Sequence, residues 1–171
     1  MQSRLVVGAL MGAALILSVG AAAPSPRTAA PPASPTDACA LLTQAQVSGA
    51  LGVSVGAGEK IVPNNTALCG WEVPGDKGVN RKRVMLGIYT QLGGLTPVDR
   101  FNHAKMPIKG ITKTPVSGVG DDAIYATTPG LGTGLIFKKG ASAFDVRVYG
   151  FPEDQIKAKE KTLALDVVAK L

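Results

Sequence analysis

Histidine and cysteine are scarce in this chain of 171 residues, which holds one histidine and two cysteines. A zinc site takes four His, Cys or carboxylate ligands, so the chain lacks an obvious ligand set. It has no Gly-x-Ser-x-Gly nucleophile elbow. Its glycine-rich stretches, Gly118–Gly120 and Gly130–Gly134, follow neither the P-loop nor the dinucleotide-binding pattern. We therefore expect a protein that is not an enzyme and that has no metal or cofactor.

Aromatic residues make up only 5% of the chain, and there is a single tryptophan. The formal net charge of +6 is spread along the sequence, apart from Arg81-Lys82-Arg83 and the nearby Lys77. A groove for nucleic acid combines clustered basic residues with aromatic ones. We therefore predict no nucleic-acid partner, and we interpret the basic cluster as a solvated loop.

The N-terminus has the pattern of an export signal. Met1–Arg4 is short and basic, Leu5–Val19 is apolar, and Val19-Gly20-Ala21 has the small residues of a cleavage site. The alternative is an uncleaved anchor, but the apolar run is close to the lower length limit for a membrane span. No cysteine stands just after the apolar run, so lipid attachment there is not expected. The sequence predicts a signal peptide over residues 1–21.

Residues 22–36 contain five prolines among alanine and serine, a composition typical of an extended linker. Residues 37–171 are long enough for one domain and hold all 12 acidic residues with 16 of the 18 basic ones, a net charge of 16 − 12 = +4. We expect this domain to be monomeric, exported to the periplasm or outside the cell, and without a stable membrane span after cleavage.

Two cysteines in an exported chain favour one disulfide, between Cys39 and Cys69. Closing a loop of about 30 residues stabilises a fold by roughly 3.5 kcal/mol in the chain-entropy model. The alternative is a pair of free thiols.

Gly134–Tyr149 reads as a β-hairpin, with two apolar runs on either side of a Lys-Lys-Gly-Ala-Ser turn. Phe144, Val146 and Val148 alternate with polar residues, so one face should pack on a core. We expect this apolar face to be covered by a C-terminal helix that begins at Pro152 and carries an apolar stripe. The stripe consists of Ile156, Leu163, Val167 and Leu171, widened by Ala164 and Val168. Glu160 falls near the stripe and predicts a partly covered turn, whereas Lys159 and Lys161 should flank the stripe or face water.

Earlier elements complete an α+β pattern. Thr43 and Gln46 predict a capping box for a helix over residues 44–51, and Thr96-Pro97 predicts a second helix that ends before Pro107. Trp71 should anchor the core beside the disulfide. The predicted strands cover residues 69–73, 83–90 and 123–127, with an extended piece near 114 and Val53 and Val55 as an edge-strand candidate. The fold class is an antiparallel sheet packed with N-terminal and C-terminal helices.

Several segments together resemble a known family. They are Asp37-Ala-Cys39-Ala-Leu-Leu-Thr, Cys69-Gly-Trp71, Val116-Ser-Gly-Val-Gly-Asp-Asp-Ala-Ile-Tyr125 and a Phe-Lys-Lys-Gly strand pair. In this order and spacing they resemble the secreted domain-of-unknown-function family numbered 3558, many of whose members are actinobacterial lipoproteins. The resemblance implies a PsbP-like α/β sandwich, similar to the extracellular sensor domain of a mycobacterial Ser/Thr kinase. It implies no activity, and the lipobox cysteine of the lipoproteins is missing here.

Two groups of residues are candidates for chemistry. His103 lies four residues after Asp99, which would place both on one helix face as an acid–base pair. A solvated histidine beside a surface carboxylate is the alternative. Asp121-Asp122 supplies oxygens suited to calcium, but the regular spacing of a calcium loop is missing. We interpret both aspartates as turn residues that bond their own backbone.

Three functions remain open after this reading. The first is a non-catalytic exported domain that binds a small ligand, an envelope component or a protein partner. The second is an envelope hydrolase that uses His103 and a carboxylate. The third is an auxiliary structural module. A pocket that brings together His103, Asp99 and a hydroxyl would favour the hydrolase, and an exposed groove would favour binding.

Overall fold

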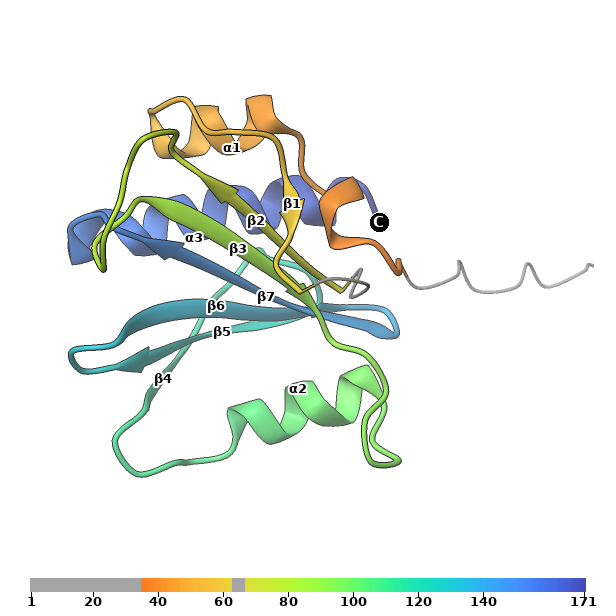
Figure 1. Cartoon of the computed structure of the whole chain (residues 1–171). Coiled ribbons are helices and arrows are strands. Elements are labelled where there is room, and N and C mark those ends of the chain that lie inside the picture. The colour runs from red at the N-terminus through yellow and green to blue at the C-terminus, as the bar shows by residue number, and fades with distance from the viewer. Residues whose placement is uncertain (1–34, 63–66) are drawn as a thin grey trace, which may run out of the picture. The chain divides into compact units, whose positions relative to one another are not determined.

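The computed structural model describes residues 35–62 and 67–171. The predicted signal peptide (residues 1–21) and all but the last two residues of the predicted linker (22–36) lie outside the described residues. The described chain has three α-helices and one antiparallel seven-stranded sheet, which confirms the α+β class (Figure 1). The elements are η1 (Ala38–Ala40), α1 (Gln44–Leu51), β1 (Glu59–Lys60), β2 (Leu68–Glu72), β3 (Arg83–Ile88), α2 (Pro97–Lys105), β4 (Thr112–Pro115), β5 (Asp122–Thr128), β6 (Gly132–Lys139), β7 (Ser142–Tyr149) and α3 (Glu153–Val168).

The predicted hairpin is confirmed as β6 and β7, and it lies at the centre of the sheet. The strand order is β1-β2-β3-β7-β6-β5-β4, so β7 pairs with β3 on one side and with β6 on the other. Gly140 allows the turn between the two strands because its φ of 56° is in the left-handed region. Phe144, Val146 and Val148 are buried on one face, as their alternation predicted.

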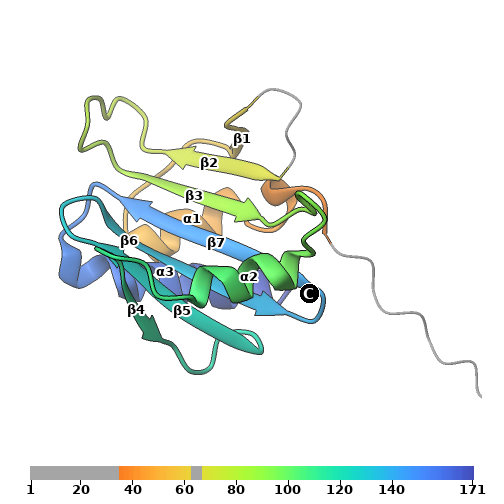
Figure 2. The same ribbon diagram turned by 90° about the horizontal axis from the view of Figure 1, so that it is seen from below.

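Helices cover the two faces of the sheet unequally. α1 and α3 lie over one face, where they bury the main core around Trp71, Leu86 and Phe144 (Figure 1). α2 lies on the other face, where Phe101 packs on a smaller cluster with Ile124, Ile136 and Ala143. In the described chain no helix covers the second face over β2 and β3 (Figure 2). That half of the sheet is therefore available to solvent or to a ligand.

The disulfide between Cys39 and Cys69 is present, and it ties η1 to the second strand. Trp71, two residues further along β2, is almost completely buried, as expected of a core anchor. Gly58, in the loop before β1, lies directly over the side chains of Trp71 and Cys69. A Cβ atom there would lie 2.7 Å from Trp71 Nε1 and 3.0 Å from Cys69 Sγ. Only glycine permits this close approach of backbone to the core.

The N-terminal caps follow the sequence prediction. Thr43 and Gln46 form the expected capping box of α1, and Gly52 ends that helix with a φ of 74°. α2 begins at Pro97 and has a second capping box, which Thr96 and Asp99 form. The edge-strand prediction for Val53 and Val55 is wrong, because the edge strand is Glu59–Lys60. Val55 is instead buried in the connecting loop, where Gln44 and Ser48 of α1 bond its backbone.

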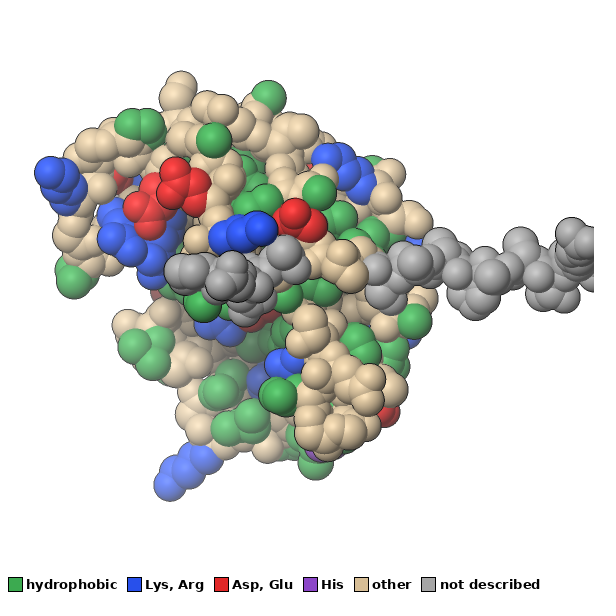
Figure 3. Space-filling model, turned by 45° about the vertical axis from the view of Figure 1, so that its right-hand side comes forward, with side chains coloured by type: hydrophobic (Ala, Val, Ile, Leu, Met, Phe, Trp, Pro, Cys, Tyr) green, Lys and Arg blue, Asp and Glu red, His purple; other side chains and the backbone are tan. Residues whose placement is uncertain are grey.

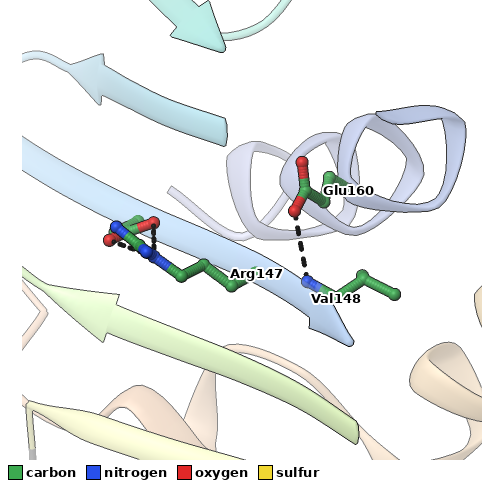
Figure 4. Close-up of polar contacts among 4 residues, drawn as sticks. Arg147, Val148 and Glu160 are labelled. Atoms are coloured by element: carbon green, nitrogen blue, oxygen red, sulfur yellow. Dashed lines mark hydrogen bonds and ion pairs between the residues drawn. The ribbon is translucent and has the colours of Figure 1, made fainter. Parts of the chain in front are cut away.

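The prediction that the turn around Glu160 is partly covered is wrong. Glu160 is completely buried between α3 and the sheet. Its Oε1 accepts a hydrogen bond from the backbone N–H of Val148 at 3.1 Å (Figure 4). The pairing of β6 with β7 ends at Leu135 opposite Val146, so Val148 lies beyond the last paired residue on that side. The carboxyl group therefore supplies the acceptor that a neighbouring strand would otherwise provide.

Lys159 has partners that its predicted position beside the stripe did not indicate. Its ammonium group donates to the carbonyl oxygen of Leu51 at 2.9 Å and lies over the Phe151 ring, 4.8 Å from the centroid. The lysine thereby binds the C-terminal end of α1, where backbone carbonyls lack helical partners. The stripe of α3 is otherwise confirmed at Ile156, Leu163 and Val167, but Leu171 lies beyond the helix and is exposed.

Candidate functional site

A cleft of about 490 Å³ opens on the half of the sheet that α2 leaves uncovered. We name it the open-face cleft. It lies between β1 with its preceding loop on one side and the β2–β3 hairpin on the other. Side chains of both charges gather on the upper half of this side of the domain, above a hollow (Figure 3). The lining residues are Gly56, Ala57, Glu59, Lys60, Ile61, Gly70, Glu72, Pro74, Arg81, Arg83, Val84 and Met85.

The strand register decides which side chains reach the open-face cleft. Gly70 of β2 is opposite Met85 of β3, and Glu72 is opposite Arg83, so these four residues share one face. Gly70 has no side chain, and a Cβ atom there would approach the Ile61 side chain at 3.2 Å. The absence of that side chain lets Ile61 pack close to the middle of β2. Apolar Ile61 and Met85 thus lie beside charged groups within one cleft.

Two arginines at the open-face cleft differ in how they are held. Arg81 Nε lies 3.3 Å from Glu72 Oε1, in an ion pair whose partners are both substantially exposed. Such a pair contributes little to stability. Arg83 is half-buried, and its guanidinium lies over the Tyr149 ring, 4.7 Å from the centroid. Among the described residues no carboxylate lies within ion-pair distance of Arg83. Its N–H donors are therefore available for an acceptor from outside the chain.

A second ion pair extends this face along β7. Arg147 Nε donates to both carboxylate oxygens of Asp145, at 3.0 and 3.2 Å. Burial raises the pKa of Asp145, and the charge of Arg147 offsets part of that rise. Burial alone would lower the pKa of Arg147, but Asp145 more than compensates and the pKa is raised. Gly134 of β6 leaves room for the pair, since a Cβ atom there would lie 3.1 Å from the Arg147 side chain.

A cation–aromatic contact marks the border between this face and α2. The guanidinium of Arg100, from α2, lies over the Tyr89 ring, 4.7 Å from the centroid, and also donates to Thr90 O. Burial raises the pKa of Tyr89 to about 12, and the charge of Asp145 adds to the rise. Tyr89 is therefore a neutral phenol at physiological pH.

Asp99, one half of the candidate acid–base pair with His103, caps the N-terminal end of α2. The Asp99 carboxylate accepts from the Thr96 hydroxyl at 2.6 Å and from the Thr96 backbone N–H at 3.0 Å. The hydrogen bond from the Thr96 hydroxyl is the main cause that lowers the pKa of Asp99, and the bond from the Thr96 backbone lowers it further. The charge of His103 has a smaller effect in the same direction. His103 is exposed on α2, and neither residue lines the open-face cleft.

Asp121 and Asp122 face different partners, and the prediction that they bond their own backbone is wrong. Asp121 accepts from the Gly140 N–H at 2.7 Å and from Lys139 Nζ at 3.0 Å, so it holds the β6–β7 turn. The Gly140 bond is the main reason that the pKa of Asp121 is lowered. Asp122 begins β5 and pairs with Lys105 at 2.5 Å. Within the described chain no group of three His, Cys, Asp or Glu residues is arranged to hold a metal ion.

Two expectations from the sequence concern Arg83: the basic cluster Arg81-Lys82-Arg83 predicted a solvated loop, whereas the strand predicted over residues 83–90 began at Arg83. The strand is confirmed, and for Arg83 the loop interpretation is wrong. Arg83 is the first residue of β3 and lies half-buried at the open-face cleft. The signal was present in the alternation of the strand. Val84 and Leu86 face the core, so Arg83 and Met85 must share the opposite face.

No known protein family, curated protein or solved structure matches this chain. Among the described helices, none has the length and apolar character that crossing a membrane requires.

Proposed function

We propose that the chain is an exported, non-catalytic binding domain that takes a small ligand, an envelope component or a peptide segment in the open-face cleft. The observation that supports this is the cleft itself, which combines exposed apolar surface at Ile61 with the available guanidinium of Arg83. Small-molecule sites typically pair an apolar wall with a few polar groups that orient the ligand. His103 does not line this cleft, so the cleft gives no support to the hydrolase hypothesis.

Export and family membership belong to the same proposal. The disulfide is compatible with an oxidising compartment. The antiparallel sheet with helices on it agrees with the PsbP-like sandwich that the resemblance to family 3558 implies. Export predicts that the mature chain begins at Ala22. N-terminal sequencing of protein recovered outside the cytoplasm checks this, and an intact Met1 on that protein would contradict it.

Binding is tested by amide chemical-shift titration of the oxidised protein with octanoate and with octanol, which have equal chain lengths and different head groups. We expect shifts that cluster at Ala57, Gly70 and Met85. Ala57→Trp should fill the cleft from its exposed rim and abolish the shifts. Ala169→Trp, at an exposed position beyond α3, is the matched control and should leave them unchanged.

The proposal is wrong if neither probe shifts the cleft amides at millimolar concentration. It is also wrong if Ala57→Trp retains the full response, because the probes would then bind elsewhere.

A further inference from the structure

Three loops that are far apart in the sequence meet at one end of the sheet. β3, β6 and β4 run in the same direction, because each is separated from the next by one antiparallel strand. The segments that lead into these strands therefore lie at the same end: the β2–β3 hairpin, the β5–β6 hairpin and the α2–β4 loop. All three are at the left of Figures 1 and 2. We name this the loop end.

Each loop of the loop end presents a large apolar side chain to solvent. Val79, in the β2–β3 hairpin, is 99% exposed, and Leu131, in the β5–β6 hairpin, is 80% exposed. Met106 and Ile108, in the α2–β4 loop, are 56% and 50% exposed. Single exposed apolar residues are ordinary on protein surfaces. Val79, Leu131 and Ile108, one in each of three loops at one end of a sheet, are an unusual group and indicate a contact surface. Met106, the C-cap of α2, lies further from that end, because its neighbour Lys105 pairs with Asp122 at the start of β5.

Basic residues accompany two of these loops. Lys77 lies two residues before Val79, and Lys109 follows Ile108 directly. Both lysines are exposed, and among the described residues neither has a carboxylate within ion-pair distance. Lys82 in the same hairpin is paired with Asp76 at 3.6 Å. The unpaired charge on the apolar loops is therefore positive.

The carboxylates of the β2–β3 hairpin, Glu72 and Asp76, are paired with Arg81 and Lys82. Among the described residues, the carboxylates that follow β7 at this end have no ion-pair partner and lie towards the other face of the sheet. Glu153 and Asp154 are exposed in the first turn of α3, which packs on the face opposite to α2. An anionic surface would be repelled there and attracted at Lys77 and Lys109. The contact should therefore tilt towards the side of the sheet that carries α2.

We propose that the loop end is a docking surface for an anionic lipid bilayer, independent of the open-face cleft. The apolar side chains lie on separate loops, as suits insertion into a soft, extended interface better than packing into one pocket of a protein. Apolar tips with adjacent lysines match the two attractions that hold peripheral proteins on anionic membranes, burial of apolar surface and charge.

The test is co-sedimentation of the secreted, oxidised protein with vesicles of phosphatidylglycerol and phosphatidylcholine, and with vesicles of phosphatidylcholine alone. We expect binding to the anionic vesicles that weakens with added salt. The double variant Val79→Ser/Leu131→Ser should bind at least about tenfold more weakly, since two apolar side chains no longer enter the interface. Lys77→Glu/Lys109→Glu should remove the preference for the anionic vesicles. All four positions are exposed, so the variants should fold, which thermal denaturation checks.

The matched control is Leu92→Ser. Leu92 is 64% exposed, but it lies in the loop after β3, at the opposite end of the sheet. The Leu92→Ser variant should bind vesicles as the wild-type protein does. The proposal is overturned if the wild-type protein does not sediment with anionic vesicles, or if Leu92→Ser weakens binding as much as the double variant. It is also overturned if the double variant loses only self-association in size-exclusion chromatography, which would assign the loop end to a protein contact.

Discussion

Glu160 and Val148 join the C-terminal helix to the central strand through one buried hydrogen bond, with 3.1 Å between Glu160 Oε1 and the Val148 nitrogen. The other carboxylate oxygen, Oε2, is buried and has no hydrogen-bond partner among the described residues. Burial is the main cause that raises the pKa of Glu160 to about 8. A neutral carboxylic acid still accepts the Val148 bond through its carbonyl oxygen, and it avoids burying a charge. Glu160 is therefore protonated in the folded protein at neutral pH.

This protonation predicts that stability falls as pH rises. The folded pKa lies above the ordinary value of 4.5, so its contribution is complete below pH 4.5 and is lost as pH rises to about 8. Glu160→Gln keeps a neutral acceptor for Val148 and should remove this slope, with a gain of a few kcal/mol over the wild-type protein near pH 8. Urea denaturation between pH 4 and 9 measures the difference. Glu153→Gln, at an exposed position of the same helix, should retain the wild-type slope, and an equal slope in Glu160→Gln would contradict the assignment.

Substitutions at two leucines of α3 test whether the apolar stripe of this helix belongs to the core or binds a partner. Leu163 is completely buried against the sheet, whereas Leu165 is 42% exposed. Leu163→Asp should destabilise the domain by more than about 4 kcal/mol, because it removes core packing and buries a charge. Leu165→Asp should cost less than about 1 kcal/mol. Thermal and urea denaturation provide the comparison. A stable monomeric Leu163→Asp protein would show that the helix does not cover the sheet.

Two neighbouring lysines of α3 should differ in their effect on stability. The Lys159 side chain donates to Leu51 O at the end of α1, while among the described residues the Lys161 side chain has no hydrogen bond or ion pair. Lys159→Met should lower the free energy of unfolding by about 1 kcal/mol, since the α1 carbonyls lose a charged donor. Lys161→Met should stay within about 0.5 kcal/mol of the wild type. Chemical denaturation of both variants side by side checks this, and equal values would mean that the Lys159 bond contributes nothing.

The disulfide should contribute substantially to the stability of this domain. It closes a loop with a sequence separation of 30 residues, which corresponds to roughly 3.5 kcal/mol in the chain-entropy model. Cys39→Ser/Cys69→Ser should therefore lower the melting temperature by about 10 °C. Alkylation of the denatured wild-type protein should label neither cysteine. Full labelling of exported protein, or an unchanged melting temperature in the double variant, would contradict this role.

Local sequence signals predicted elements more reliably than they predicted contacts. The capping box at Thr43 and the alternation of Phe144, Val146 and Val148 are local patterns, and the structure confirms both. Lys159 and Glu160 have partners more than ten residues away, which no local pattern specifies. Helical spacing placed Glu160 beside the stripe, but it could not show that β6 ends short of Val148 and leaves an N–H to be bonded.

The sequence by itself determined the helices, the central strands and their apolar faces, because these depend on periods of 2 and 3.6 residues and on capping chemistry. It also determined the disulfide pair, because the chain has only two cysteines, but it did not predict the edge strand β1. Only the tertiary structure decided that Arg83 lies at a cleft and that Val79, Leu131 and Ile108 share one end of the sheet. These relationships depend on strand order and on which face α2 covers, and both arise from packing between segments distant in the chain.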